Sequence, residues 1–281
     1  MEEKMRYKHR YAFDKGDIRL KDFLISNEIP YKSSYGIIVF EIFEDNEHWE
    51  EVKRIADQYD IPSLGETVYS TNEFNNAKWL SVRSKWRWAY PQPEGNMAYE
   101  HITYNDENLC DGCGSGLVQK DSFRMKKSPK WSSKNFLMLN WIEDELFISS
   151  KAKDELQKST LKGFDFYEVK KNAKDNVILD DVHQLYISDQ LKPGMIKESN
   201  AIAITLFCQK CGGTKYILSG RSLIFQKNLF DNVNVDIIKT AETFGDGHMC
   251  ARIILVSQEF FRFIKKNKLD RNLEFEPILL V

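Results

Sequence analysis

Four of the five cysteines in this sequence form two pairs with the spacing Cys-x-x-Cys. The pairs are Cys110 with Cys113 and Cys208 with Cys211, and a glycine follows each pair directly. Two thiols at this spacing in a glycine-containing turn can point at one centre, and a tetrahedral Zn²⁺ ion takes four thiolate sulfurs at about 2.3 Å. We therefore expect Cys110, Cys113, Cys208 and Cys211 to bind one zinc ion per chain.

Redox-active pairs and unpartnered structural thiols are the alternatives to a metal site. A redox-active Cys-x-x-Cys pair normally opens a helix, which lowers the pKa of its first thiol. Here Gly114-Ser-Gly116 follows the first pair and Gly212-Gly213 follows the second, which favours a tight turn over a helix start. A site closed by four cysteines leaves no coordination position for water, so the zinc is expected to be structural and not catalytic.

The fifth cysteine, Cys250, lies two residues after His248. The two residues could replace a metal ligand, or Cys250 could act as a nucleophile with His248 as its base. The stretch Met249–Val256 also has the composition of a buried strand, in which Cys250 is a small hydrophobic residue, and we prefer this interpretation. Since the sequence has no Gly-x-Ser-x-Gly, P-loop or His-Glu-x-x-His motif, we expect that the protein is not an enzyme.

Two other polar features are expected to be structural. Glu143, Asp144 and Glu145 are three consecutive carboxylates, and because adjacent side chains usually diverge, we expect them on a solvated surface. His183 lies in an extended apolar stretch, where a lone histidine is more often a hydrogen-bonded core residue than a metal ligand.

Length and composition indicate a globular protein. The 281 residues are 42% hydrophobic and 13% aromatic, which is enough for a substantial core. A net charge of −2 gives no overall attraction to nucleic acid or to acidic membranes. The sequence contains no run of about 18 apolar residues and does not start with a signal peptide. We expect a cytoplasmic protein with no membrane role, and in a reducing compartment paired cysteines favour metal over disulfides.

The elements that must position the cysteines form two regions. In the first 70 residues, Tyr35–Phe43 has the composition of a strand, and the flanking stretches have helical spacing of apolar residues. We predict an N-terminal α/β region over residues 1–70 and a zinc-tethered core over residues 71–281.

The core contains an internal similarity. Ser149, Leu156 and Leu161 recur 108 residues later as Ser257, Ile264 and Leu269. Each segment has a serine helix cap, helical spacing of apolar residues and then an alternating strand, and each lies downstream of one cysteine pair. We predict an α+β fold with two related half-repeats, at about residues 105–190 and 200–281. Each half-repeat comprises a cysteine knuckle, strand, helix and strand, and one Cys₄ zinc site joins them.

One segment suggests an alternative function. Lys78, Arg83, Lys85 and Arg87 alternate with tryptophan rings up to Trp88, a texture typical of single-stranded nucleic-acid binders. The same alternation is typical of a strand with Trp86 and Trp88 on one face, which is the interpretation we prefer. The alternative is a nucleic-acid-associated protein resembling a zinc ribbon.

Together, several motifs resemble the bacterial double-CXXCG motif family. They are Trp79-Leu-x-Val-Arg83, Tyr90-Pro-x-Pro93, Cys110-x-x-Cys-Gly-x-Gly116-x-x-Gln119 with Phe123, Leu139-x-Trp141-x-x-Asp144-Glu-x-Phe147, and Cys208-x-x-Cys-Gly212. The resemblance extends from about residue 70 to the C-terminus and does not include residues 1–60. It implies zinc binding by the four paired cysteines and no catalytic residues. Since some members of the family look like immunity proteins, it also implies that the partner is a polymorphic protein toxin.

Overall fold

The computed structural model describes residues 5–281 except 15, 17, 176 and 198. It shows a mixed α+β fold, as predicted, with two compact units. Unit 1 contains the described residues up to Asn76 together with Leu218–Ser222, and unit 2 contains Ala77–Ile217 and Leu223–Val281. None of the helices in the described part of the chain combines the length and the apolar character needed to cross a membrane.

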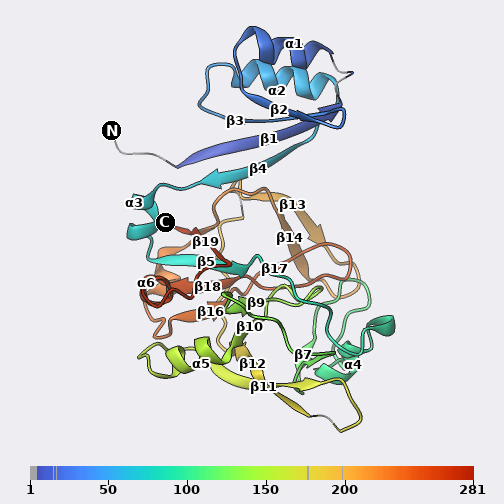
Figure 1. Cartoon of the computed structure of the whole chain (residues 1–281), viewed down its shortest axis with the longest axis vertical. Helices are drawn as coiled ribbons and strands as arrows, with labels where there is room; N and C mark the ends of the chain where they lie inside the picture. The colour runs from blue at the N-terminus through green and yellow to red at the C-terminus, as the bar shows by residue number, and fades with distance from the viewer. Residues whose placement is uncertain (1–4, 15, 17, 176, 198) are drawn as a thin grey trace. The chain divides into compact units, whose positions relative to one another are not determined.

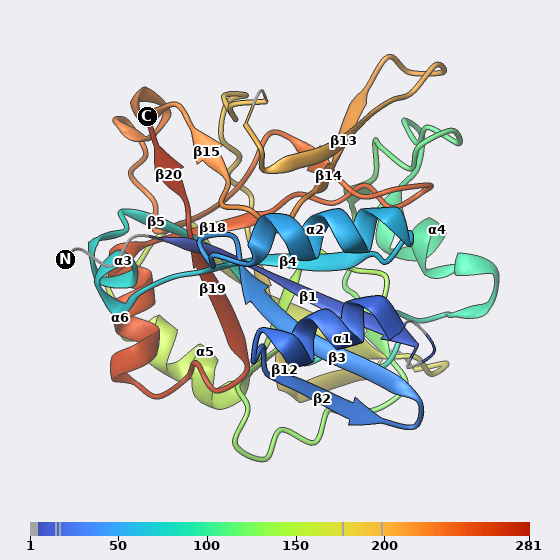
Figure 2. The ribbon, with the colours of Figure 1, turned by 90° about the horizontal axis from the view of Figure 1, so that it is seen from above.

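Unit 1 is a four-stranded antiparallel sheet with the strand order β2-β3-β1-β4. Helices α1 and α2 lie side by side on one face of this sheet (Figures 1 and 2). The elements are β1 (Arg6–Asp14), α1 (Ile18–Ser26), β2 (Tyr31–Ser34), β3 (Ile37–Phe43), α2 (Trp49–Gln58), β4 (Ser63–Val68) and α3 (Thr71–Asn76).

The alternation of β3 and the helical spacing of α2 explain this packing. Ile38, Phe40 and Ile42 lie on one face of β3 and are buried, as expected from a period of two. Trp49 and Val52 belong to the buried stripe of α2, and these side chains meet the sheet in one core. The predicted strand is thus confirmed from Ile37 onward.

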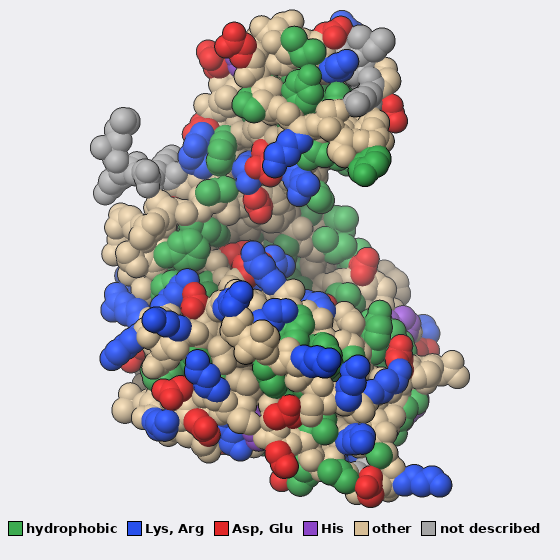
Figure 3. All heavy atoms as spheres, in the orientation of Figure 1, with side chains coloured by type: hydrophobic (Ala, Val, Ile, Leu, Met, Phe, Trp, Pro, Cys, Tyr) green, Lys and Arg blue, Asp and Glu red, His purple; other side chains and the backbone are tan. Residues whose placement is uncertain are grey.

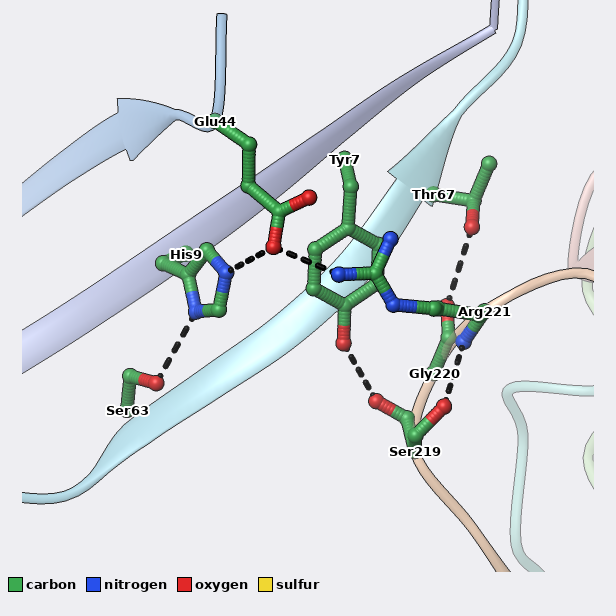
Figure 4. A network of polar contacts seen from close by, with 8 residues as sticks. All are labelled: Tyr7, His9, Glu44, Ser63, Thr67, Ser219, Gly220 and Arg221. Atoms are coloured by element: carbon green, nitrogen blue, oxygen red, sulfur yellow. Dashed lines mark hydrogen bonds and ion pairs between the residues drawn. The ribbon is translucent and has the colours of Figure 1, made fainter. Parts of the chain in front are cut away.

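The segment Leu218–Ser222 is held to the strands of unit 1 by polar contacts, which Figure 4 shows. Arg221 donates to Glu44, whose Oε1 atom also lies 3.0 Å from Nε2 of His9. Burial alone would raise the pKa of Glu44, but the contacts with His9 and Arg221 lower it. Gly220 has a φ of +85°, and a Cβ there would lie 2.0 Å from the carbonyl oxygen of Gly65, so this approach requires glycine.

Unit 2 contains two larger sheets and several short ribbons. Its helices are η1 (Gly95–Met97), α4 (Tyr99–Thr103), α5 (Ser150–Gln157), η2 (Lys227–Phe230) and α6 (Gln258–Lys266). Its strands are β5 (Trp79–Ser84), β6 (Tyr104–Asn105), β7 (Val118–Gln119), β8 (Arg124–Met125), β9 (Phe136–Leu137), β10 (Leu146–Ser149), β11 (Asp165–Lys171), β12 (Ile178–Tyr186), β13 (Ile202–Phe207), β14 (Thr214–Leu218), β15 (Ile224–Phe225), β16 (Ile237–Lys239), β17 (Thr243–Phe244), β18 (Ile254–Ser257), β19 (Leu273–Pro277) and β20 (Leu279–Leu280).

The two larger sheets have the orders β8-β11-β12-β10-β9 and β16-β18-β5-β19. A helix follows one strand of each sheet: α5 follows β10 and α6 follows β18. The serine caps are confirmed, because Ser149 Oγ accepts a hydrogen bond from the Ala152 N–H at 3.2 Å and Ser257 Oγ accepts one from the Phe260 N–H at 3.1 Å. A cap of this kind contributes about 1 kcal/mol to helix stability.

The strand prediction around Trp86 and Trp88 is wrong in its extent. Strand β5 ends at Ser84, because beyond it the chain leaves the β5 sheet and bonds to Met138. The Trp88 N–H donates to the Met138 carbonyl, and the Met138 N–H donates to the Trp86 carbonyl. The two tryptophan rings still contact each other, at 5.8 Å between centroids, and pack against the apolar core of the β10 sheet.

Candidate metal centre

The structure brings the four paired cysteines together. Their sulfur atoms all lie within 4.8 Å of one another, with 3.7 Å between Cys110 and Cys208 and 3.6 Å between Cys113 and Cys211. These distances exceed the roughly 2.05 Å of a disulfide bond. In a tetrahedral site with zinc–sulfur bonds of about 2.3 Å, neighbouring sulfurs lie about 3.8 Å apart. The four cysteines can therefore hold a metal ion, and their arrangement is compatible with zinc.

The two cysteine turns have the same backbone structure. We call Cys110–Ser115 knuckle 1 and Cys208–Gly213 knuckle 2. In each, the first cysteine N–H donates to the carbonyl five residues later, and the glycine after the second cysteine donates back to the first cysteine carbonyl. The N···O distances are 2.8 and 2.8 Å in knuckle 1 and 2.8 and 2.9 Å in knuckle 2. This glycine has a φ of +76° in knuckle 1 and +71° in knuckle 2, conformations that favour glycine.

Each knuckle lies at the end of a two-stranded ribbon. Knuckle 1 connects the antiparallel strands β6 and β7, and knuckle 2 connects the neighbouring strands β13 and β14. Two exposed side chains join the knuckles: Lys210 Nζ lies 2.8 Å from an Asp111 carboxylate oxygen. The Lys210 ammonium lowers the pKa of Asp111, but solvent screens an ion pair as exposed as this one.

A buried lysine that the sequence analysis did not identify supports knuckle 1. Lys215 is 5% exposed, and its Nζ donates to the carbonyls of Cys113 at 2.9 Å, Gly247 at 2.6 Å and Met249 at 2.7 Å. Three carbonyl acceptors satisfy the three ammonium donors, which makes the burial of this charge tolerable. Knuckle 1 and the loop at residues 247–249 are thereby held together. Little in the sequence indicates this role, because Lys215 lies near the start of a short strand, β14, where a lysine is usually exposed.

The surroundings shift the pKa values of three of the paired thiols, and not all in the same direction. Burial opposes ionisation of Cys113, but hydrogen bonds from the side chain and backbone of Ser115 outweigh it and lower the pKa of Cys113 to about 6. Backbone N–H groups of Cys211 and Lys210 lower the pKa of Cys208. A backbone hydrogen bond from Gly112 favours the Cys110 thiolate, but burial and the neighbouring cysteines raise the pKa of Cys110 to about 11. Metal binding to such a set takes up thiolates and releases protons.

Cys250 and His248 lie outside this sulfur cluster. The prediction that Cys250 lies in a strand is wrong: β18 begins at Ile254, and before it Ala251 forms only a single bridge with Phe244. The Met249 N–H donates to the Asp246 carbonyl in a turn, and the Met249 carbonyl accepts from Lys215, so the backbone just before Cys250 is hydrogen-bonded outside any sheet. Burial raises the pKa of the Cys250 thiol, which keeps it protonated at neutral pH and makes it a poor nucleophile.

His183 is likewise placed outside the metal cluster. It lies on β12, partly buried, and its Nε2 atom is 3.5 Å from Ser150 Oγ at the start of α5. Burial lowers the pKa of His183, which favours the neutral ring. Its contacts are those of a residue that joins a helix to a sheet.

A cavity of about 490 Å³ lies beside knuckle 1. Four segments provide much of its lining, namely residues 114–119, 141–145, 186–190 and 248–252. The motif residues Gln119, Trp141, Asp144 and Glu145 are among them. Residues far apart in the sequence thus converge next to the candidate metal centre.

The prediction that the carboxylates at residues 143–145 lie on a solvated surface is wrong for Glu145. This side chain is only 7% exposed, and β10 begins at the next residue. Glu145 forms an ion pair with Lys239 at 2.5 Å and accepts a hydrogen bond from Gln184 at 2.9 Å. Gln184 and Gln119 also exchange two amide hydrogen bonds, of 2.8 and 2.7 Å. Burial opposes the Lys239 charge, but the carboxylates of Glu145 and Asp144 outweigh it and raise the pKa of Lys239.

Comparison with known proteins adds no assignment to this geometry. No family model matches the sequence, and no curated protein matches it.

Proposed function

We propose that Cys110, Cys113, Cys208 and Cys211 bind one structural Zn²⁺ ion and that the protein acts by binding another protein. The observation that carries the metal assignment is the set of sulfur–sulfur distances, 3.6 and 3.7 Å across the two knuckles, which match the edges of a zinc–thiolate tetrahedron. A bound zinc ion would supply a cross-link between two chain segments that are 94 residues apart in the sequence. Closing so long a loop costs only logarithmically more than closing a short one.

We further propose that the knuckles belong to two halves related by duplication. The shared strand order supports this: β11-β12-β10-β9 in one sheet corresponds to β19-β5-β18-β16 in the other. In both sheets the strand before the helix and the strand after it flank a central antiparallel strand, which is β12 or β5 (Figure 1). This proposal moves the predicted bounds of 105–190 and 200–281, because the first half would begin with β5, before knuckle 1, and the second with β12, before knuckle 2. Each half would then contribute its first strand to the sheet of the other half.

The proposed partner is a polymorphic protein toxin, and the proposed role is that of a bacterial immunity protein in the cytoplasm. The resemblance of the motif residues to the double-CXXCG family supports this role. A closed Cys₄ site also supports it, because such a site stabilises a surface without offering a reactive position.

The ion pairs of the cations between Lys78 and Trp88 weaken the nucleic-acid alternative. Lys85 and Arg83 both lie 2.6 Å from Glu274, and Arg87 pairs with Glu143. Glu276 also lies 3.7 Å from Arg83, so three cations of the basic and aromatic segment are matched by three carboxylates of the same chain. In Figure 3, Lys and Arg side chains on the displayed face are interspersed with Asp and Glu. We favour protein binding for these reasons.

Co-expression with the toxin encoded next to the gene tests the proposed role. The expected result is a complex recovered by pull-down and rescue of growth, and a matched strain that carries a vector without the gene should die. Absence of both the complex and the rescue would refute the immunity role. Filter binding of single-stranded nucleic acid at increasing salt tests the alternative, since phosphate contacts must give an affinity that falls steeply with salt.

A further inference from the structure

The cavity beside knuckle 1 has the size of a ligand site. Its volume of about 490 Å³ lies within the roughly 300–1,000 Å³ of small-molecule pockets. All of its lining residues belong to unit 2. The metal centre does not use it, because the four sulfur atoms point at one another across the knuckles.

Acidic side chains outnumber basic ones in the lining. The charged lining residues are the carboxylates Glu100, Glu143, Asp144, Glu145 and Asp189 and the cations Lys239 and Arg252. Lys239 is already paired with Glu145 and lies 3.9 Å from Asp144. The lining carries five carboxylates and two cations, and Glu143 is also paired with Arg87 outside the lining. An excess of two negative charges remains, which favours a positively charged ligand.

Tyr104 lies in the same negatively charged lining. Its pKa is raised well above the usual value, first by burial and then by the carboxylates of Asp144 and Glu145. Burial is the larger cause, and the negative charge of the two carboxylates opposes ionisation of the hydroxyl group further.

An aromatic ring is held at the cavity in an unusual backbone conformation. Trp141 lines the cavity, is 42% exposed, and has a φ of +71°. A bulky residue in this region is a strained outlier, and such outliers cluster at ligand sites. The rings of Tyr99 and Tyr90 lie 6.0 and 4.4 Å from that of Trp141 and fix its orientation. Among aromatic side chains, tryptophan is the best partner for an organic cation.

Arg252 determines what else the ligand must offer. It is the second cation of the lining, and a guanidinium group carries five N–H donors and no acceptor. A carbonyl oxygen on the ligand is an acceptor that these donors can use. The Arg252 backbone N–H lies 3.4 Å from a carboxylate oxygen of Asp144, so an acceptor for Arg252 and a cation for Asp144 would bind close together.

We infer that this cavity binds a basic amino-acid residue, whose guanidinium or ammonium group lies against Trp141 and Asp144 and whose carbonyl oxygen accepts from Arg252. A free basic amino acid and an arginine or lysine side chain of a protein partner offer this same chemistry. The second source rests on the proposed protein-binding function. The first is independent of it.

The test is a calorimetric titration of the full zinc-loaded chain with N-acetyl-argininamide. Its matched probe is N-acetyl-citrullinamide, which has nearly the same shape and the same carbonyls but no charge. We expect the citrulline compound to bind at least about tenfold more weakly, since it loses both the charge-assisted contact with the carboxylate and the cation–π contact. Equal affinity of the two probes, or binding of neither, would overturn the inference.

Variants assign the binding to this cavity. Asp144→Asn should weaken binding of N-acetyl-argininamide about tenfold, and Trp141→Ala should weaken it about fivefold. The control is Asp165→Asn, because Asp165 is an exposed carboxylate on β11 outside the lining, and it should leave the affinity unchanged. Zinc content and melting temperature must match across the variants. Unchanged affinity in both cavity variants would show that the ligand binds elsewhere and would refute the site.

A capped pentapeptide, Gly-Ser-Arg-Ser-Gly, distinguishes the two sources. Tighter binding than N-acetyl-argininamide assigns the cavity to a side chain within a protein, and weaker binding assigns it to a free amino acid. If capped arginine binds but the toxin pull-down fails, the cavity assignment stands and only the proposed immunity role fails.

Discussion

Knuckle 1 and knuckle 2 share their cysteine spacing and backbone hydrogen bonds but differ in their surroundings. Cys113 of knuckle 1 is 4% exposed, whereas its counterpart Cys211 is exposed. Lys215 and the loop at residues 247–249 pack on knuckle 1, while knuckle 2 lies at the end of the β13–β14 ribbon, where Ile204 and Phe207 are also exposed. The same six-residue turn therefore forms in buried and in exposed surroundings. We expect the surrounding contacts to set how much each knuckle contributes to stability.

The largest expected effect comes from removing one cysteine metal ligand from either knuckle. Cys110→Ser and Cys208→Ser should each lose stoichiometric zinc and lower the melting temperature substantially, because zinc–thiolate binding in zinc-finger peptides contributes about 10–16 kcal/mol at neutral pH. Metal analysis and thermal unfolding measure both effects. Cys250→Ser is the control and should keep its zinc. Stoichiometric zinc in both ligand variants would refute the shared site.

Alanine substitutions at the two equivalent glycines should lower stability by different amounts. Left-handed backbone costs a residue with a Cβ about 1–2 kcal/mol, so Gly212→Ala should lower the free energy of unfolding by about that amount. A Cβ at Gly114 would in addition lie 1.9 Å from the His248 carbonyl oxygen, whereas none of the described atoms lies within 4 Å of one at Gly212. We expect Gly114→Ala to cost about 3 kcal/mol or more in denaturant unfolding. Equal costs would show that the packing on knuckle 1 is not as described.

Substitutions of two lysines compare the contribution of a buried lysine to stability with that of an exposed ion pair. Lys215→Met leaves three carbonyls without their donor and should cost about 2–3 kcal/mol of unfolding free energy. Lys210→Met removes only the exposed ion pair with Asp111 and should change stability little. Chemical denaturation of the zinc-loaded variants provides the comparison. A larger cost for the Lys210 variant would contradict it.

The smallest effect concerns the residue after each glycine, which is Ser115 in knuckle 1 and Gly213 in knuckle 2. The Ser115 hydroxyl lies 3.1 Å from the Cys113 sulfur and helps to lower the pKa of that thiol to about 6. Ser115→Ala removes a donor to the thiolate, so the pKa of Cys113 in the metal-free protein should rise. Thiolate absorbance against pH measures this shift. The zinc-loaded variant should release its metal at a slightly higher pH during acidification, and an unchanged titration would contradict the role of Ser115.

Local patterns predicted the local parts of this structure. The serine caps at Ser149 and Ser257 and the alternation of β3 depend on residues within one or two turns, and the structure has them as expected. The burial of Glu145 and the role of Lys215 depend on partners about 94 and 102 residues away, and neither spacing nor composition indicates such partners. The central position of β5 between β18 and β19 is a long-range pairing of the same kind.

The contribution of Leu218–Ser222 to unit 1 makes that unit discontinuous in sequence. A fragment that ends at Asn76 would retain Glu44 and His9 but would lack Arg221, which is their basic partner, and the carbonyls that accept from Tyr7 and Thr67. Cutting the chain at its apparent boundary would therefore leave the N-terminal piece with unmatched polar groups on β1 and β4. Dissection of this protein should proceed by supplying the 218–222 segment in trans, as a synthetic peptide, and not by truncation alone.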